Sequence, residues 1–223
     1  MQPPSRQVWH TALLKRTYDS KICGRKKNVN VLLPAGYTTA KKYPVLYVLH
    51  GYWGNEDALL DAGDASLRLR QIIGNGIAAG EAKEMNVLTK EQMPYIQQNY
   101  SVLTGRENTA ITGFSMGGRE SLNIGFSRPD LFGYVGAMCP ALGLTTDRIP
   151  ADQLKFNGVS PYLLFVSAGS NDQIVWSSPK DYHDTMTQNG TMHICHTVTG
   201  GDHGGKAICP HMYNYIRAIF HAS

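Results

Sequence analysis

The segment Gly113-Phe114-Ser115-Met116-Gly117 has the spacing G-x-S-x-G and lies between an apolar stretch and a helix-like stretch. A sharp turn from a strand into a helix leaves little room for side chains two residues before and after its central residue, which is why glycine is needed there. Such a turn holds a serine hydroxyl at the carboxyl edge of a sheet, near the N-terminus of a helix. The motif therefore predicts that Ser115 is a nucleophile. A glycine-rich turn in which the serine only caps the helix is the alternative.

A nucleophilic serine needs a general base, and the base needs a carboxylate that fixes its tautomer. Two polar loops follow apolar segments further along the chain: residues 168–172 end in Asp172, and residues 200–205 contain His203. On a parallel sheet both loops reach the edge that carries the serine, in the chain order serine, aspartate, histidine. We predict that His203 is the base and Asp172 the orienting acid. Asp202 directly precedes His203 and is poorly placed to orient its ring, so we expect a local loop role for it.

Acyl transfer also requires two backbone N–H groups that bind the oxyanion. Met116 follows the serine directly and is expected to supply one of them, and Tyr52, after the apolar segment 43–49, the other. Trp53 and Trp176 lie in or near the same loops and are expected to contact an aromatic or sugar group of the substrate. The alternative for both is an ordinary, partly buried aromatic residue. His50 is expected to shape its loop and not to act as a base.

The elements that must position these residues alternate between strands and helices. Strands are expected at residues 8–14, 28–33, 43–49, 109–113, 134–138, 161–168 and 193–198. Helices are expected at residues 66–79, 89–100, 115–128 and 178–189, with a last helix along the apolar stripe of Met212, Ile216, Ile219 and Phe220. This alternation predicts an α/β fold with a mostly parallel sheet and helices on both faces.

Length and composition exclude several other classes of protein. The 223 residues are 42% hydrophobic and carry a formal net charge of +4, which predicts a single domain over residues 1–223 and no nucleic-acid partner. No apolar run approaches the roughly 18 residues that a membrane span requires, so no membrane partner is expected. Residues 1–5 lack a charged-then-apolar leader, so no signal peptide is expected in this chain.

The four cysteines are scattered and include no C-x-x-C pair, which gives no support to a metal site or a redox motif. We expect them to be small buried hydrophobic residues. A disulfide between Cys195 and Cys209, which flank one glycine-rich loop, is left open as an alternative.

Five segments together resemble the esterase-D-like enzymes of carbohydrate esterase family 1, especially their feruloyl esterase domains. They are LPAGY at 33–37, KYPVLYVLHG at 42–51, GFSMGG at 113–118, PDLFGYVGA at 129–137 and GGDH at 200–203. The resemblance implies an α/β-hydrolase that cuts ester-linked ferulate or acetate from xylan without a metal or cofactor. It implies the same roles for Ser115, Asp172 and His203. It further implies feruloylated or acetylated xylan fragments as partners, and a secreted protein of a kind that often forms part of a larger plant-cell-wall-degrading enzyme.

Three alternative functions stay open. An acetylxylan esterase and an esterase-D-type thioesterase would use the same serine mechanism on other esters. A non-catalytic carbohydrate-binding module that keeps the hydrolase fold belongs to a different class of protein.

The chain departs from the family at one place. After the first helix the family has another strand and a substrate-side loop, whereas residues 80–88 of this chain lead almost directly into the next expected helix. We expect at most a vestigial strand at residues 85–88. Because this strand lies between the second and third strands of an α/β-hydrolase, its loss would leave a hole in the sheet.

Overall fold

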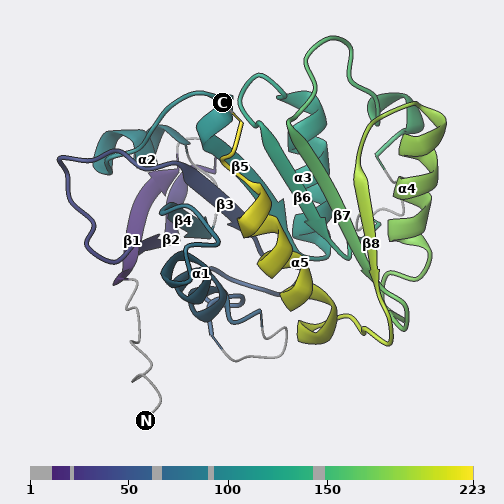
Figure 1. The fold of residues 1–223 in the computed structure, drawn as a ribbon, viewed down its shortest axis with the longest axis horizontal. Coiled ribbons are helices and arrows are strands. Elements are labelled where there is room, and N and C mark those ends of the chain that lie inside the picture. The colour runs from purple at the N-terminus through teal and green to yellow at the C-terminus, as the bar shows by residue number, and fades with distance from the viewer. Residues whose placement is uncertain (1–11, 21–22, 62–66, 90–92, 143–148, 223) are drawn as a thin grey trace.

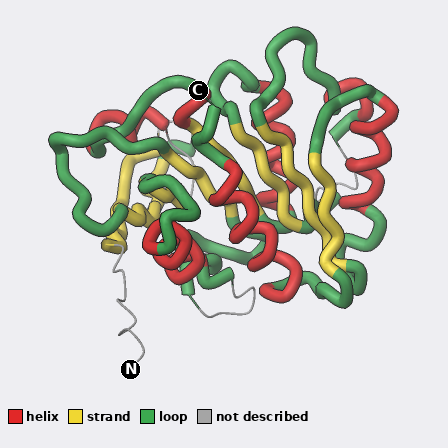
Figure 2. The backbone as a smooth tube through the Cα atoms, viewed as in Figure 1, coloured by secondary structure: helices red, strands yellow, loops and turns green. Residues whose placement is uncertain are grey.

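The computed structural model describes residues 12–20, 23–61, 67–89, 93–142 and 149–222. Its strands form one sheet with helices on both faces (Figures 1 and 2). The strands are β1 (Ala12–Ser20), β2 (Arg25–Leu33), β3 (Val45–Leu49), β4 (Asn86–Thr89), β5 (Thr109–Gly113), β6 (Tyr134–Met138), β7 (Leu163–Gly169) and β8 (Ile194–Val198). The helices are α1 (Leu69–Ala78), α2 (Met93–Asn99), α3 (Met116–Ser127), α4 (Ser178–Gln188) and α5 (Gly205–Ala218), with short 3-10 turns at Arg106–Asn108 and Ala151–Gln153.

The sheet confirms the predicted mostly parallel α/β architecture. Its strand order is β1-β2-β4-β3-β5-β6-β7-β8. β2 pairs antiparallel with β1 and β4, and every pair from β4 to β8 is parallel. The carboxyl ends of β5, β7 and β8 therefore lie at one edge, which brings together the loops that carry the predicted catalytic residues.

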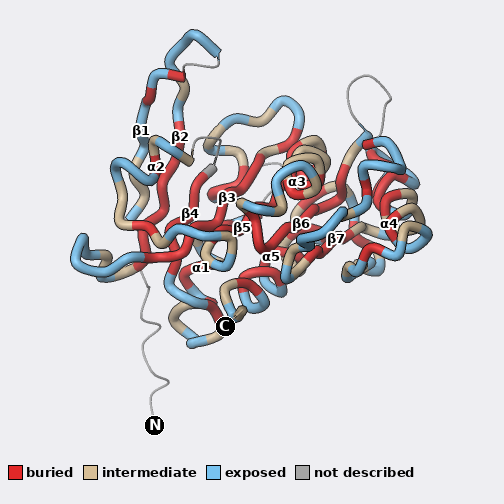
Figure 3. The backbone as a smooth tube through the Cα atoms, turned by 90° about the horizontal axis from the view of Figure 1, so that it is seen from above, coloured by how far each residue is buried: buried red, intermediate tan, exposed pale blue. Residues whose placement is uncertain are grey.

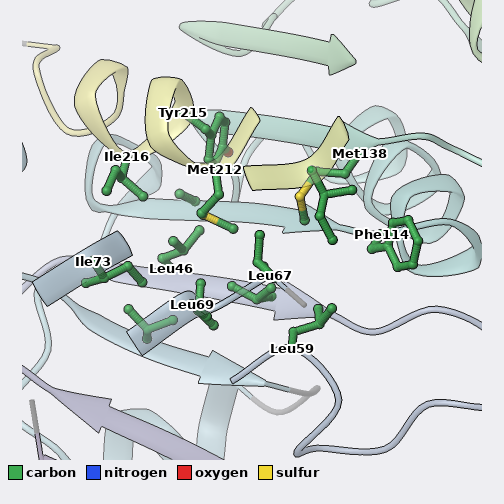
Figure 4. Close-up of a cluster of buried hydrophobic side chains, with 14 of the residues drawn as sticks. Leu46, Leu59, Leu67, Leu69, Ile73, Phe114, Met138, Met212, Tyr215 and Ile216 are labelled. Carbon is green, nitrogen blue, oxygen red and sulfur yellow. The ribbon is translucent and has the colours of Figure 1, made fainter. Parts of the chain in front are cut away.

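Two hydrophobic clusters cover the two faces of the sheet. Residues of α1 and α5 pack in one cluster and residues of α2, α3 and α4 in the other. β3 and β5 are buried along their whole length, as expected for parallel strands that are covered on both faces. Figure 3 shows this buried centre, and Figure 4 shows Leu46 of β3 near Met212 and Ile216 of α5 and Ile73 of α1. In the described part of the chain, no helix has the length and apolar character needed to cross a membrane.

The sheet has no hole at residues 85–88, where the sequence led us to expect at most a vestigial strand. Asn86–Thr89 form β4, which pairs parallel with β3 through Val45–Tyr47 and antiparallel with β2 through Asn30–Leu32. A strand of four residues is long enough to bond the backbone of both neighbours, and Val87 and Leu88 are fully buried between them. The strand is therefore short but not vestigial. The shortening falls on the connection that follows, because α2 already begins at Met93.

Several expected boundaries also differ. β1 runs to Ser20 because it forms a long hairpin with β2, whereas residues 8–11 of the expected first strand lie outside the described residues. Thr89, expected at the start of a helix, is the last residue of β4. All four cysteines are described and each is a free thiol, so the Cys195–Cys209 disulfide is absent. Of the four, Cys139 is buried as expected, whereas Cys23 is exposed and the other two are half-buried.

His211 lies inside α5, not at its start, and ties two strands together. Its Nδ1 is 2.8 Å from Ser167 Oγ on β7, and its Nε2 is 3.2 Å from Thr112 Oγ1 on β5. β6 runs between these strands, and its Gly136 leaves room there, because a Cβ would lie 2.6 Å from Thr112 Oγ1. The ring is fully buried and stacks on Phe165. Burial, with a smaller contribution from nearby His196, lowers the pKa of His211 to about 3.

We predict that His211 makes the folded protein sensitive to mild acid. An unfolded histidine titrates near pH 6.5, so below that pH the unfolded chain binds a proton that the folded chain does not, down to about pH 3. This one group should remove about 1.3 kcal/mol of stability between pH 7 and pH 5.5. Urea unfolding of wild type and His211→Gln at both pH values measures it: the variant, although less stable at pH 7, should lose less stability on acidification. Equal losses in the two proteins would contradict the assignment.

Candidate active site

The turn between β5 and α3 holds Ser115 in a left-handed backbone conformation, with φ 57° and ψ −117°. Two glycines make this turn possible. A Cβ on Gly113 would lie 2.3 Å from the carbonyl oxygen of Gly117, and a Cβ on Gly117 would lie 2.5 Å from the carbonyl oxygen of His50. No side chain fits at either position, which is the physical reason that the motif requires glycine at both.

Neighbouring strands hold the backbone of Ser115 at this edge of the sheet. Its N–H donates to the carbonyl of Met138 at the end of β6 (2.9 Å), and its carbonyl accepts from the N–H of Ala141 (3.0 Å). The carbonyl also accepts from the N–H of Arg119 in α3, at 3.0 Å. The strained residue is thus bonded to both the strand beside it and the helix after it.

The structure brings Asp172 and His203 into direct contact. Asp172 lies in the loop after β7 and His203 in the loop between β8 and α5, and His203 Nδ1 is 2.6 Å from Asp172 Oδ2. The other carboxylate oxygen accepts the backbone N–H groups of Ile174 and Val175, at 2.9 and 3.2 Å. Because the carboxylate accepts, Nδ1 of His203 carries the hydrogen and Nε2 is left for proton transfer when the ring is neutral.

The surroundings of this pair favour an ionised aspartate. Burial acts to raise the pKa of Asp172, but the hydrogen bonds from His203, Ile174 and Val175 outweigh it and lower the pKa below its ordinary value. The Asp172 side chain is 1% exposed and that of His203 13%. The ring of Phe114, the residue before Ser115, lies 4.6 Å from the ring of His203, which places the histidine against the serine turn.

The two expected oxyanion donors lie next to the serine turn. Met116 is the first residue of α3, where backbone N–H groups have no acceptor within the helix. Tyr52 follows Gly51, which packs so tightly on the turn that a Cβ there would lie 3.2 Å from the Cβ of Ser115. His50 Nδ1 lies 2.7 Å from the carbonyl oxygen of Gly51, consistent with a role in shaping this loop.

Trp53 and Trp176 are not packed as ordinary partly buried aromatic residues. They are 90% and 73% exposed, and both have a left-handed backbone, with φ 61° and 49°. Trp53 follows Tyr52, whose ring centre is 4.6 Å away, and Trp176 follows the segment that binds the Asp172 carboxylate. Bulky residues rarely adopt this conformation, so both loops hold an indole outward beside the site at some cost in strain.

A cavity of about 1360 Å³ adjoins the turn on the face of the sheet that carries α2 and α3. Its lining includes Met116 and Gly117 at one end of α3 and Arg128 just beyond the other. The tip of the β1–β2 hairpin and α2 form the opposite wall. The cavity therefore lies in the helical layer on this face, and the sheet beneath it is continuous.

One side chain beside the site was not identified from the sequence as part of it. Cys139 follows β6, and its sulfur lies within 4.8 Å of ligand atoms of Asp172 and His203. From the sequence, Cys139 is expected only to be a small buried residue, although its place directly after a strand that ends at the catalytic edge was a usable signal. Among the described residues, Cys139, Asp172 and His203 form the one cluster of three side chains that could ligate a metal ion. Two of its members already hydrogen-bond each other, so we assign it to proton chemistry.

Comparison with known proteins identifies the family. The model of the Esterase family, described as "Putative esterase", matches residues 20–87 and 78–203. An endo-1,4-beta-xylanase/feruloyl esterase from Xylanibacter ruminicola is 31% identical over 160 residues, covering 60% of this chain and 22% of the relative. Endo-1,4-beta-xylanase Y from Acetivibrio thermocellus is 25% identical over 212 residues, covering 78% and 19%. The chain therefore spans about a fifth of the length of these two relatives.

Solved structures agree with the family model. A CE1 ferulic acid esterase from Anaeromyces mucronatus, determined in complex with ferulic acid, is 35% identical, with a TM-score of 0.89 over 98% of this chain and 94% of that one. S-formylglutathione hydrolase from Staphylococcus aureus has a TM-score of 0.69 at 16% identity, over 95% of each chain, and shares the fold. Together with the Asp172–His203 pair beside the serine turn, these matches show that the chain belongs to the Esterase family, among the CE1 esterases.

Proposed function

We propose that this chain is a serine esterase domain that releases ferulate from xylan, and that it belongs to a larger, secreted plant-cell-wall-degrading enzyme. The observation that carries the proposal is the buried hydrogen bond between Asp172 and His203, next to the strained turn at Ser115. The names of the relatives at 35% and 31% identity support ferulate as the acyl group and xylan as its carrier. A location outside the cell fits a polymeric substrate that cannot cross a membrane.

The reaction proceeds in two steps with the same three side chains. Ser115 Oγ attacks the ester carbonyl carbon while His203 Nε2 takes the hydroxyl proton, and Asp172 stabilises the imidazolium that forms. The oxyanion is bound by the N–H groups of Met116 and Tyr52. When the tetrahedral intermediate collapses, His203 returns the proton to the sugar hydroxyl that leaves. Water then attacks the feruloyl-enzyme in the same way and frees ferulic acid and Ser115.

Ser115→Ala should abolish hydrolysis of methyl ferulate and p-nitrophenyl acetate, with a loss of kcat on the order of 10⁶-fold, because no other group can form the acyl-enzyme. Ser127→Ala, at the exposed end of the same helix, is the matched control and should keep the wild-type rate. Wild type, but not Ser115→Ala, should also be labelled by a fluorophosphonate probe. A folded wild-type protein that takes no label would favour the non-catalytic carbohydrate-binding module.

Asp172→Asn should lower kcat/KM by about 10³- to 10⁴-fold, because an amide can donate to Nδ1 and so hold His203 in the wrong tautomer. Asp202→Asn provides the control, since it removes a neighbouring, exposed carboxylate that does not bond the ring; its kcat/KM should stay within about twofold of wild type. Initial rates of methyl ferulate hydrolysis measure both. A large loss in Asp202→Asn with a small one in Asp172→Asn would reverse the assignment.

Trp53→Ala and Trp176→Ala test whether the exposed indoles contact the feruloyl ring. Loss of one aromatic contact worth about 1 kcal/mol should raise KM for methyl ferulate roughly fivefold and leave KM for p-nitrophenyl acetate, which has no aromatic acyl group, nearly unchanged. Tyr213→Ala on α5 serves as a control for loss of a surface aromatic residue. Equal effects on both esters would contradict contact with the acyl ring, and a rate panel of feruloyl, acetyl and glutathione esters would then show the preferred substrate.

A further inference from the structure

The segment Met138–Ala141, which begins at the last residue of β6, contacts both halves of the proposed catalytic machinery. On one side, the carbonyl of Met138 and the N–H of Ala141 bond the backbone of Ser115, at 2.9 and 3.0 Å. On the other, the N–H of Cys139 donates to the carbonyl of Ser167 on β7, at 2.8 Å. Cys139 itself has a left-handed backbone, with φ 45°, which is unusual for a residue with a side chain. The segment is thus held in one conformation between the serine and the loop of the acid.

The side chain of Cys139 points to the acid. Its sulfur lies within 4.8 Å of ligand atoms of both Asp172 and His203. Cys139 is 0% exposed, so water does not compete for this contact. Burial and the negative charge of Asp172 raise the pKa of the Cys139 thiol to about 12. The sulfur therefore keeps its proton at neutral pH and can only act as the donor toward the carboxylate.

We propose that Cys139 is a positioning residue of the esterase, whose thiol donates the fourth hydrogen bond to the Asp172 carboxylate. A carboxylate has about four acceptor positions, and three of them are taken by His203 Nδ1 and the N–H groups of Ile174 and Val175. The thiol completes the set from the side of β6. It fixes the rotamer of Asp172 and withdraws negative charge that would otherwise hold the proton on His203.

The ionisable groups around His203 come from four parts of the fold, and they set the direction of the effect. Asp172 faces the ring from the loop after β7, Cys139 from the end of β6, and Asp202 lies in the loop of His203 itself and acts on Cys139 through its charge. Lys206 follows in the first turn of α5, over Gly200. Phe114, on the side of the serine turn, carries no charge. Loss of the Cys139 thiol removes a hydrogen-bond donor from Asp172 and leaves its carboxylate more basic. The imidazolium form of His203 is then favoured.

The inference rests on the proposed function, and two readouts separate it from that function. The acid limb of kcat/KM against pH reports protonation of the catalytic base in the free enzyme. NMR titration of the His203 imidazole reports the same event without any turnover.

Cys139→Ala should move both midpoints upward by about 0.3–0.5 pH unit, a two- to threefold gain in proton affinity. Cys139→Ser keeps a donor and should leave them at or below the wild-type value. Cys195→Ala, a half-buried thiol on β8, is the control and should not move them.

Unshifted midpoints in Cys139→Ala, or an upward shift in Cys139→Ser equal to that in Cys139→Ala, would overturn the role of the thiol. If Cys139→Ala does not fold, the serine variant still decides, because an upward shift there contradicts donation to Asp172. A wild-type protein that hydrolyses no ester but whose His203 midpoint moves as expected would refute the proposed function and leave the contact established.

Discussion

The site depends on one steric constraint, the left-handed backbone of Ser115 between two positions where no Cβ fits. A residue other than glycine in this region carries strain of about 1–3 kcal/mol, which the surrounding structure must hold. Here the restraint comes from outside the turn: Met138 of β6 accepts the N–H of Ser115, Ala141 beyond β6 donates to its carbonyl, and Leu49 of β3 accepts the N–H of Phe114. The nucleophile is therefore presented by the sheet as a whole, and the register of β3, β5 and β6 fixes its position.

Asp172 is fixed by hydrogen bonds more than by its burial. Its carboxylate would be neutral in an apolar pocket, yet two backbone N–H groups and His203 keep it ionised. Those N–H groups belong to the same tight loop that leads to the exposed Trp176. The same loop conformation thus holds the carboxylate of Asp172 and leaves the Trp176 side chain exposed to solvent. His211 adds a further connection within the sheet, because the two nitrogens of its ring hydrogen-bond β5 and β7 across β6.

The parts of the fold that follow from local sequence patterns could be predicted from the sequence. The buried parallel strands β3 and β6 are continuous apolar runs, and Gly113 and Gly117 mark the turn through a steric rule that acts within five residues. The meeting of Asp172 and His203 was also predictable, because parallel strands end at the same edge. The place of Cys139 at this edge could be predicted in the same way, but the direction of its side chain toward the pair could not, since it depends on a left-handed residue after β6. The pairing of β4 with two strands distant in sequence was missed for a similar reason, as only tertiary structure shows it.

The sheet and the cavity beside it depend on different contacts. β4 pairs with β3 on one side and with β2 on the other, so the sheet is continuous here although the strand has four residues. The cavity lies in the helical layer on one face of this sheet, between α2 and α3. The hydrogen bonds that hold Ser115, Asp172 and His203 come from α3, the end of β6 and the loops after β7 and β8, and none of these bonds involves β4 or α2. The surface next to the turn can therefore vary with α2 and the β1–β2 hairpin, and with it the shape offered to a substrate, while the acid–base geometry is retained.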